Sequence, residues 1–514
     1  MKRIPAVAVA VLLAALALAG GTPQRAAAET AAVQNYLVVF SGGYAVDGTY
    51  AVERTYAVLC TYAVSGVYAV DGDYAVGCDY AVDGTDAVYA VAHDYAVYAV
   101  TLAGGTVVDD LLKQIGVMVV QSADPAFADV MSQYAVVEEV GRDLGWQGVP
   151  TSENGGGPDT TGGALEQLQW SMQQIRAPQA HAVQAGSSAV TVGILDSGID
   201  GNHVNFIGTD GRSNVACSRG RNSVSFLPGG PGLGNPDPCV DNGFHGTHVA
   251  GIVAARANGL GVVGVAPNVT LVPVKVCDTT GYCYASSVVD GITYAGDQHL
   301  NVINMSFFVD DDTFQTSTEL KCNDDPAQRA FRKSVERAVS YARSRGVVPV
   351  AALGNESLDL SADGGCSVVP AETPGVIGVA ALGPNKAKAS YSNYGKVDVA
   401  APGGVSTGDC TGGVLSTFPG STYGCISGTS MASPHATGVA ALIVSQYGKL
   451  GADGHVTMDP GKVASILESS AVDQGLQGDD ICYGHGRIDA LRAVTGDTSK
   501  LYDATAPFCP EYGS

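Results

Sequence analysis

Val192-Gly193-Ile194-Leu195-Asp196-Ser197-Gly198 is an apolar run of strand-forming residues that ends in an acid and a turn. A buried strand of this kind is typical of a parallel sheet, because such sheets are covered on both faces. Apolar, β-rich runs alternate downstream with helix-like segments, which predicts an α/β domain with a mainly parallel sheet flanked by helices. The expected strands are 190–196, 271–276, 302–306, 347–352 and 376–381, and the expected helices are 245–255, 285–294, 326–345 and 430–447.

Two further segments place reactive side chains at the starts of expected helices. His245-Gly246-Thr247-His248-Val249-Ala250-Gly251 opens one helix with a histidine, and Gly428-Thr429-Ser430-Met431-Ala432-Ser433-Pro434 opens another with a serine after a glycine turn. Pro434 is expected in the first turn of that helix, where a missing N–H does no harm. Active sites of parallel sheets gather at the carboxyl ends of the strands, where Asp196 also lies.

Acyl transfer explains why these residue types belong together. A serine hydroxyl becomes a good nucleophile when an imidazole takes its proton, and a carboxylate on the other ring nitrogen fixes the tautomer. Free N–H groups at a helix N-terminus can hold the negative oxygen of a tetrahedral intermediate. We therefore predict Asp196, His245 and Ser430 as a catalytic triad.

The order Asp, His, Ser and the three motifs resemble the subtilisin-like (S8) serine proteases. A fourth motif, Val350-Ala351-Ala352-Leu353-Gly354-Asn355-Glu356, completes a likeness that covers about residues 168–495. The resemblance implies that Asn355 is the side-chain donor of the oxyanion hole, beside the backbone N–H of Ser430. Residues 35–147 resemble the inhibitor-like propeptide of the family, mainly through 136–140. A secreted serine endopeptidase, made as a precursor that processes itself, is the expected function.

The resemblance also implies that a substrate binds as an added strand. Residues 304–308 would pair with one side of the substrate backbone, and the loop 281–283 would cover the other. Phe308 stands where relatives commonly have glycine and would narrow the cleft, as would Leu353, whereas Glu356 would favour a basic P1 side chain. These hints conflict, so the P1 preference stays open. The predicted substrate-binding residues are Ser306, Phe307, Phe308, Gly281 and Gly354.

The resemblance implies no required cofactor but leaves a structural calcium open. In the family an aspartate a few residues after the catalytic one often binds the ion, and Asn205 stands at the matching position. The loop 256–262, with Asn258, has a compatible length. Because calcium prefers more carboxylate ligands than these, no metal ligand is assigned.

The net charge of -23 and the pI of about 4.6 argue against nucleic acid as a partner, since binding it needs a basic surface. Protein or peptide substrates and the chain's own propeptide are the expected partners, and a monomer is expected. Residues 1–28 predict a secretory signal, with Lys2 and Arg3 before an apolar run and a small-residue cleavage site at 26–28. No later stretch is apolar enough to span a bilayer, so an extracellular protein without a membrane contact is expected.

An even number of cysteines, 12, in an exported chain predicts disulfides. Spacing alone does not fix the connectivity, and pairing of neighbours along the chain is the working hypothesis. Cys60 and Cys78 could also be bridged. The neighbouring pairs are Cys217/Cys239, Cys277/Cys283, Cys322/Cys366, Cys410/Cys425 and Cys482/Cys509.

The expected propeptide, 29–150, contains a repeat. Tyr-Ala-Val recurs every six residues from Tyr44 to Tyr80 and irregularly up to residue 100. An even period suits an extended chain or a β-helix, but a low-complexity insertion in a loop is the favoured interpretation. Strands at 36–40, 117–120 and 136–140, an amphipathic segment at 109–114 and a helix at 127–134 complete a small α+β domain. The chain then continues as a Gly-rich linker (151–167), the catalytic domain (168–500) and a tail (501–514).

Two other functions remain open at this point. The repeat could be an adhesion or assembly module whose maturation the protease domain serves, although its place upstream of the linker means that processing would release it. A sedolisin-type acid protease shares the Gly-Thr-Ser context. That family replaces the histidine base with Glu and the oxyanion Asn with Asp, so His245 and Asn355 argue against it.

Overall fold

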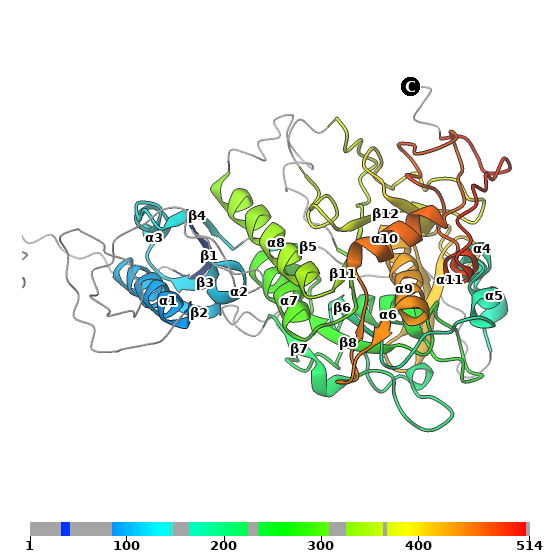
Figure 1. The fold of residues 1–514 in the computed structure, drawn as a ribbon, viewed down its shortest axis with the longest axis horizontal. Helices are drawn as coiled ribbons and strands as arrows, with labels where there is room; N and C mark the ends of the chain where they lie inside the picture. The colour runs from blue at the N-terminus through cyan, green and yellow to red at the C-terminus, as the bar shows by residue number, and fades with distance from the viewer. Residues whose placement is uncertain are drawn as a thin grey trace, which may run out of the picture.

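The protein consists of a small N-terminal unit packed beside a large α/β domain (Figure 1). The small unit lies against helices α7 (Ala285–Asp297) and α8 (Pro326–Ser344) of the large domain. The expected fold class is confirmed. The computed structural model describes residues 32–41, 85–143, 145–147, 164–224, 235–307, 325–362 and 367–509.

A seven-stranded parallel sheet forms the centre of the large domain. Strand β6 comes first along the chain. The next two strands of this sheet, β7 and β8, lie on one side of β6, with β8 adjacent to it, and β10 to β13 lie on the other side. The strand order therefore reverses at β6, and the carboxyl edge at such a point is where α/β folds bind their ligands. In spatial order the strands are β13 (Val399–Pro402), β12 (Ile377–Leu382), β11 (Val348–Ala352), β10 (Val302–Met305), β6 (Thr191–Asp196), β8 (Thr270–Lys275) and β7 (Arg221–Asn222).

Helices cover both faces of this sheet. Val192 and Ile194 of β6 point to the side of α6 (His245–Ala254) and α9 (Thr429–Tyr447), and Leu195 points to the side of α7 and α8. Successive strand residues alternate between the faces, and both faces are apolar here because both are covered.

Smaller elements surround this core. Helix α11 (Ala490–Thr495) begins at Ala490, because the preceding Asp489 caps its first turn by accepting from the Arg492 N–H. Four of the proposed disulfides are confirmed, namely 217–239, 277–283, 410–425 and 482–509, whereas Cys60, Cys78, Cys322 and Cys366 lie outside the described residues. The remaining elements are α4 (Trp170–Gln174), α5 (Ala177–His181), β9 (Tyr282–Tyr284), the hairpin β14 (Val414–Phe418) and β15 (Thr422–Ile426), β16 (Lys449–Leu450), β17 (Val456–Thr457), α10 (Pro460–Ser469), α11 (Ala490–Thr495) and the 3-10 turns Glu166–Leu168, Val204–Phe206 and Cys217–Arg219.

Residues just outside both ends of the expected catalytic domain pack against it. Leu165 is buried and donates its N–H to the Gly261 carbonyl, so residues assigned to the linker already pack on the domain. In the expected tail, Asp503 forms ion pairs with Lys386 and Arg487. None of the helices in the described part of the chain is long and apolar enough to cross a membrane.

The N-terminal unit is a four-stranded antiparallel sheet with helices on one face. Tyr36 and Val38 of β1 pack toward α1 and α3, and Leu37 and Val39 pack toward α7 and α8 of the large domain. The segment expected to be amphipathic from Asp109 is instead the end of a strand followed by one helical turn. The strand order is β2 (Thr106–Leu111), β3 (Val117–Ser122), β1 (Gln34–Phe40) and β4 (Val137–Arg142), with α1 (Thr85–Leu102), α2 (Leu112–Ile115) and α3 (Phe127–Met131).

The end of the Tyr-Ala-Val repeat is helical, which corrects the prediction of a loop insertion for this part. Residues 85–102 form α1, and Ala96, Ala99 and Val100 are buried among those of its residues whose side chains are described. These positions are spaced three and four apart and share one helix face. Tyr98 is 58% exposed, so the small residues of the motif, and not this tyrosine, make the packing surface. Residues 44–84 of the repeat lie outside the described residues.

Candidate active site

Asp196 and His245 form a buried pair at the carboxyl edge of the sheet. His245 Nδ1 lies 2.9 Å from Asp196 Oδ2 and 3.0 Å from Oδ1, and the two side chains are at most 1% exposed. Asp196 ends β6 and His245 begins α6. A β-carbon on Gly246 would lie 2.1 Å from the Gly198 carbonyl oxygen, so only glycine lets the helix start this close to the strand end. The carboxylate is therefore placed to hold one imidazole tautomer.

A second buried acid, Asp241, ties these two elements together and was missed by the sequence analysis. Its Oδ2 accepts from the N–H and hydroxyl of Thr247 at 2.8 and 2.6 Å, and its Oδ1 accepts from Ser197 Oγ at 2.9 Å. Ser197 Oγ in turn accepts from the Gly246 N–H. Burial raises the pKa of Asp241, against the hydrogen bonds from Thr247. An acid four residues before a helix-opening histidine was the available signal, since acids favour helix starts.

Ser430 is the second residue of α9 and is 5% exposed. Its N–H is one of the first four in the helix, which have no acceptor within it. Pro434 was expected in the first turn but is the sixth residue, so it removes the N–H that would bind the Ser430 carbonyl. Ser306 Oγ donates to that carbonyl at 2.8 Å and so replaces the lost bond.

The hydroxyl of Ser430 does not bind the imidazole in this structure. Ser430 Oγ donates to the Ser306 carbonyl at 3.1 Å, while His245 Nε2 is buried and has no hydrogen-bond partner among the described residues. Helices α6 and α9 pack against each other. Catalytic hydrogen bonds are often loose in free enzymes and tighten with substrate, so this geometry is compatible with proton transfer from serine to histidine.

Asn355 lies beside the start of α9. Its Oδ1 accepts from the N–H and the hydroxyl of Thr429, both at 2.9 Å, which fixes the amide so that Nδ2 is its free end. Nδ2 has no acceptor among the described residues. A β-carbon built on Gly428 would lie 3.6 Å from both Asn355 Nδ2 and the Ser430 nitrogen, so the two donors flank one spot. Such a pair of donors can stabilise a developing oxyanion.

The predicted substrate-binding residues have different surroundings. Gly281 closes a turn with φ +81°, and Gly354 has φ +108° with its N–H directed to Thr429 Oγ1. Ser306 follows β10 and contacts Ser430 through both its side chain and its carbonyl. Phe307 is fully buried in the core on the α7 side, so only its backbone could meet a substrate. Phe308 lies outside the described residues.

Of the three hints about the primary pocket, those from Leu353 and Glu356 are not supported by the structure. Leu353 is fully buried in the core, so its side chain cannot narrow an open cleft. Glu356 Oε2 accepts from the Asn355 N–H at 2.7 Å and from Asn393 Nδ2 at 3.1 Å. Burial raises the pKa of Glu356. The carboxyl thus holds the loop that carries Asn355, a role that its sequence position does not reveal.

A short strand of the N-terminal unit pairs with the loop expected to bind substrate. Strand β5 (Gly145–Gln147) runs antiparallel to β9, with Gly145 opposite Tyr284 and Gln147 opposite Tyr282. The Cys277–Cys283 disulfide ties the middle residue of β9 to the start of the loop that precedes this strand. The edge of β9 therefore accepts an extended chain as an added strand.

The loop at the family's calcium position is closed by two amides. Asn258 Nδ2 donates to the carbonyls of Val204 and Ile207 at 2.9 and 2.8 Å, and Asn205 Nδ2 donates to that of Arg256 at 3.0 Å. Asn205 Oδ1 accepts from the Val262 N–H, so both ends of that amide are already hydrogen-bonded. A cation would need these carbonyl oxygens, which the two amides already occupy, and the amides carry no charge that would attract it. The residues present do not fit calcium.

Stability of this loop should therefore be independent of calcium. In a full-length Ser430→Ala protein, which cannot digest itself, Asn258→Ala should lower the free energy of unfolding by about 1–3 kcal/mol, equally in EDTA and in calcium. Asn202→Ala, at an exposed asparagine nearby, is the matched control and should change little. Thermal unfolding measures both, and a loss seen only when calcium is present would mean that the loop binds the ion.

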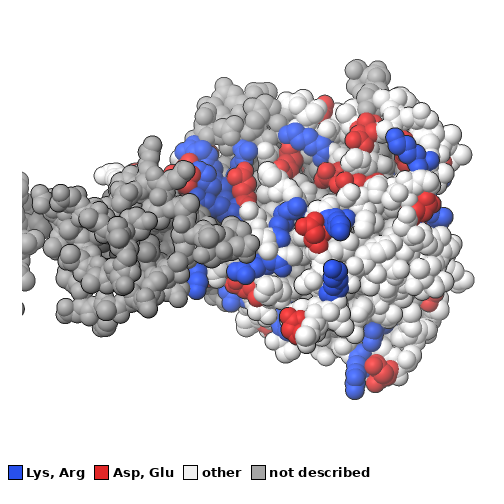
Figure 2. Space-filling model, in the orientation of Figure 1, with Lys and Arg blue, Asp and Glu red and all other residues white. Residues whose placement is uncertain are grey.

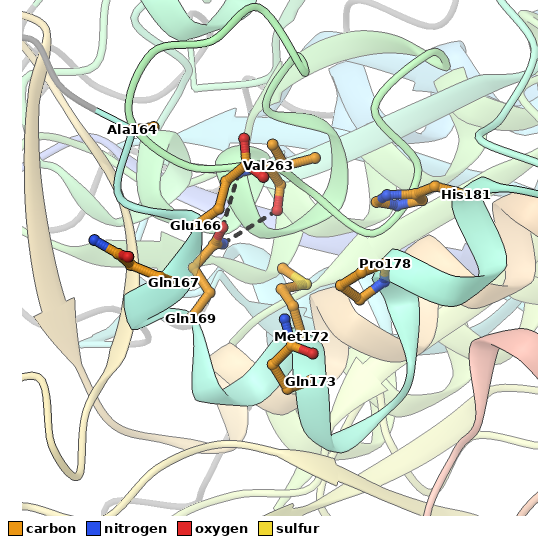
Figure 3. A pocket seen from close by; sticks show the side chains of 9 residues that line it. All are labelled: Ala164, Glu166, Gln167, Gln169, Met172, Gln173, Pro178, His181 and Val263. Atoms are coloured by element: carbon orange, nitrogen blue, oxygen red, sulfur yellow. Dashed lines mark hydrogen bonds between the residues drawn. The ribbon is translucent and has the colours of Figure 1, made fainter.

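A surface pocket beside the N-terminal segment of the large domain is separate from these residues (Figure 3). Gln169 fixes its wall by pairing with the backbone of Val263, donating to the carbonyl at 3.1 Å and accepting from the N–H at 2.9 Å. None of the predicted site residues is among the described residues that line it, which are Ala164, Glu166, Gln167, Gln169, Met172, Gln173, Pro178, His181 and Val263.

Known proteins share both the sequence and the fold. A model of the subtilase family, of the peptidase S8 type, matches residues 187–486. Subtilisin NAT of Bacillus subtilis subsp. natto is 36% identical over 332 residues, or 64% of this chain and 72% of the relative. A subtilisin of Bacillus pumilus is 36% identical over 64% of this chain and 99% of its own length. The epidermin leader peptide processing serine protease (EpiP) of Staphylococcus aureus has a similar fold, with a TM-score of 0.63 at 19% identity over 91% of this chain and 99% of that one.

Proposed function

Since the chain belongs to the subtilase family and is a serine endopeptidase, we propose that Asp196, His245 and Ser430 are its catalytic triad. Ser430 Oγ attacks the scissile carbonyl while His245 Nε2 takes its proton and later delivers it to the leaving amine. Asp196 holds the ring and stabilises the imidazolium. The 2.9 Å contact between buried Asp196 and His245 is the observation that carries this assignment.

Stabilisation of the oxyanion falls to Asn355 Nδ2 and the Ser430 N–H. Because Thr429 holds the amide oxygen of Asn355, the donor is fixed before the reaction and needs no reorganisation as charge develops. His245 Nε2, which has no hydrogen-bond partner in the part of the chain that the structure describes, is free to receive the serine proton. No organic cofactor is needed for this chemistry.

The N-terminal unit acts as an inhibitory propeptide in this proposal. Its β5 occupies the edge of β9, where an extended substrate would bind. Glu138 of β4 forms ion pairs with Lys333 and Arg337 of α8, and Glu139 pairs with Arg329. Figure 2 shows Lys and Arg side chains gathered over α8. A β-carbon on Gly141 would lie 2.3 Å from the Ala327 α-carbon, so the backbone of β4 packs directly against the backbone of α8 at this point.

Export and self-cleavage complete the proposal. The basic and apolar start of the chain supports secretion, as do the four disulfides in the described residues. Because β5 lies in the position of a substrate, the chain that follows it is the expected place of cleavage, at the Gly-rich linker.

Self-processing can be tested with a Ser430→Ala precursor purified alone. After export the mutant should keep its N-terminal unit, because no nucleophile is left, while the wild type loses this unit. Adding a trace of active wild-type enzyme should convert the mutant, which controls for correct folding at the linker. Normal maturation of the isolated mutant would show that another protease cleaves the precursor.

A further inference from the structure

The side chains of β5 and of the residues before it indicate which substrate side chains fit beside β9. Gly145 faces Tyr284 across the β5–β9 pair. A β-carbon on Gly145 would lie 2.7 Å from Cε1 and 2.8 Å from Cδ1 of the Tyr284 ring. Real β-carbons do not approach a ring this closely, so the ring lies directly over the position where any larger residue would put its side chain.

The ring of Tyr284 is held in place. Its hydroxyl donates to Asp278 Oδ2 at 3.2 Å, and Asp278 Oδ1 accepts from the N–H groups of Thr280 and Tyr282 at 2.8 and 3.1 Å. Cys283, the neighbour of Tyr284, is tied to Cys277 by a disulfide. Moving the ring aside would break the contact with Asp278, so the restriction on size is built into the loop.

Two residues before Gly145, Asp143 reaches the start of α7. Its Oδ1 accepts from the Ser286 N–H at 2.9 Å and its Oδ2 from the Ser286 hydroxyl at 2.5 Å. Tyr284, which precedes α7, makes no capping bond with its side chain, so Asp143 supplies the cap from another unit of the chain. Burial raises the pKa of Asp143 to about 6, against the two bonds from Ser286 that favour its charged form.

We propose that Tyr284 and Ser286 form an extended substrate subsite that selects a glycine opposite Tyr284 and a carboxylate side chain two residues toward the amino end. The preferred segment thus reads acid, any residue, glycine, as Asp143-Leu144-Gly145 does. This inference rests on the proposed binding of substrate as a strand along β9. Once the propeptide has left, Ser286 is an uncapped helix start, which favours an incoming anion.

Competition by synthetic peptides tests the subsite on the processed enzyme. A peptide with the sequence of residues 141–149 should inhibit hydrolysis of a general peptide substrate at pH 8, where the acid is ionised. Replacing its glycine by leucine should weaken inhibition about 10- to 100-fold, with alanine between the two. Replacing its aspartate by alanine should weaken inhibition about tenfold.

A second variant assigns these effects to the named side chains. In Tyr284→Ala enzyme the glycine and leucine peptides should differ by less than about threefold, because the ring is gone, while the aspartate should still matter. Equal inhibition of the wild type by the glycine and leucine peptides would overturn the inference. Inhibition by none of them, with the general substrate still cleaved, would instead show that peptides do not bind along β9.

A measurement on the whole precursor does not depend on catalysis. In the Ser430→Ala background, Gly145→Leu should lower the melting temperature, and adding Tyr284→Ala should recover most of the loss. An unchanged melting temperature in the Gly145→Leu protein would overturn the steric role of Tyr284 even if the enzyme proved inactive.

Discussion

Replacing His245 by alanine should reduce kcat by about 10⁴- to 10⁶-fold and leave KM nearly unchanged. The imidazole is the base that takes the serine proton in the proposed mechanism, and its Nδ1 is held by Asp196 at 2.9 Å. Both groups are buried, so water cannot easily take over the role. Steady-state kinetics on a peptide substrate measures the loss. The same substitution should leave the precursor unprocessed.

His248→Gln is the matched control, because this histidine lies one helix turn away on α6. His248 Nε2 lies 3.0 and 3.2 Å from the carbonyls of Val414 and Gly424. Burial lowers its pKa to about 3, so it stays neutral and serves packing. The control should lose stability but keep kcat within about tenfold once folded. A His245→Ala enzyme with comparable activity would contradict the assignment of the base.

Asn355→Ala should reduce kcat by about 10²- to 10³-fold with little change in KM, because the donor acts on the oxyanion and not on the bound substrate. The substitution has a second effect, since Asn355 Oδ1 also accepts from the N–H and hydroxyl of Thr429. A fall in activity alone would therefore not distinguish loss of the Asn355 Nδ2 donor from a disturbance of the start of α9.

Asn355→Asp separates these two roles. Aspartate keeps an oxygen for Thr429 but removes the Nδ2 donor and places negative charge near the oxyanion. The account expects this variant to be at least as slow as the alanine variant, with the same melting temperature as the wild type within a few degrees. Recovery of kcat to near the wild-type value in Asn355→Asp would mean that the residue only positions α9.

The parts of the site predicted from sequence are those marked by a change of secondary structure. Asp196 ends a buried strand, and His245 and Ser430 open helices, so each is flagged by its own motif. The same local signals gave most strands and helices of the large domain, because their apolar faces repeat with regular spacing.

Features that depend on contacts between distant segments could not be read in the same way. Asp241 acts through Thr247 and Ser197, and the three-residue strands β5 and β9 are too short to show a period. Pro434 was expected in the first turn because proline is common there. It lies deeper in α9 because the Ser306 hydroxyl replaces the hydrogen bond to the Ser430 carbonyl that proline cannot make. The helical end of the repeat, α1, is stabilised by burial of Ala96 and Val100 against the sheet. A repetitive sequence does not indicate which of its copies will be buried in this way.

Labelling with a fluorophosphonate probe tests whether Ser430 is the nucleophile and whether the enzyme processes itself. The secreted wild type and a Ser430→Ala variant are treated in parallel, and the intact mass and the modified peptide are recorded. We expect one label, on Ser430, in a wild type whose mass has fallen by the N-terminal unit, and an unlabelled variant that keeps this unit. A processed wild type that takes no label, or a label that persists in the Ser430→Ala variant, would contradict it.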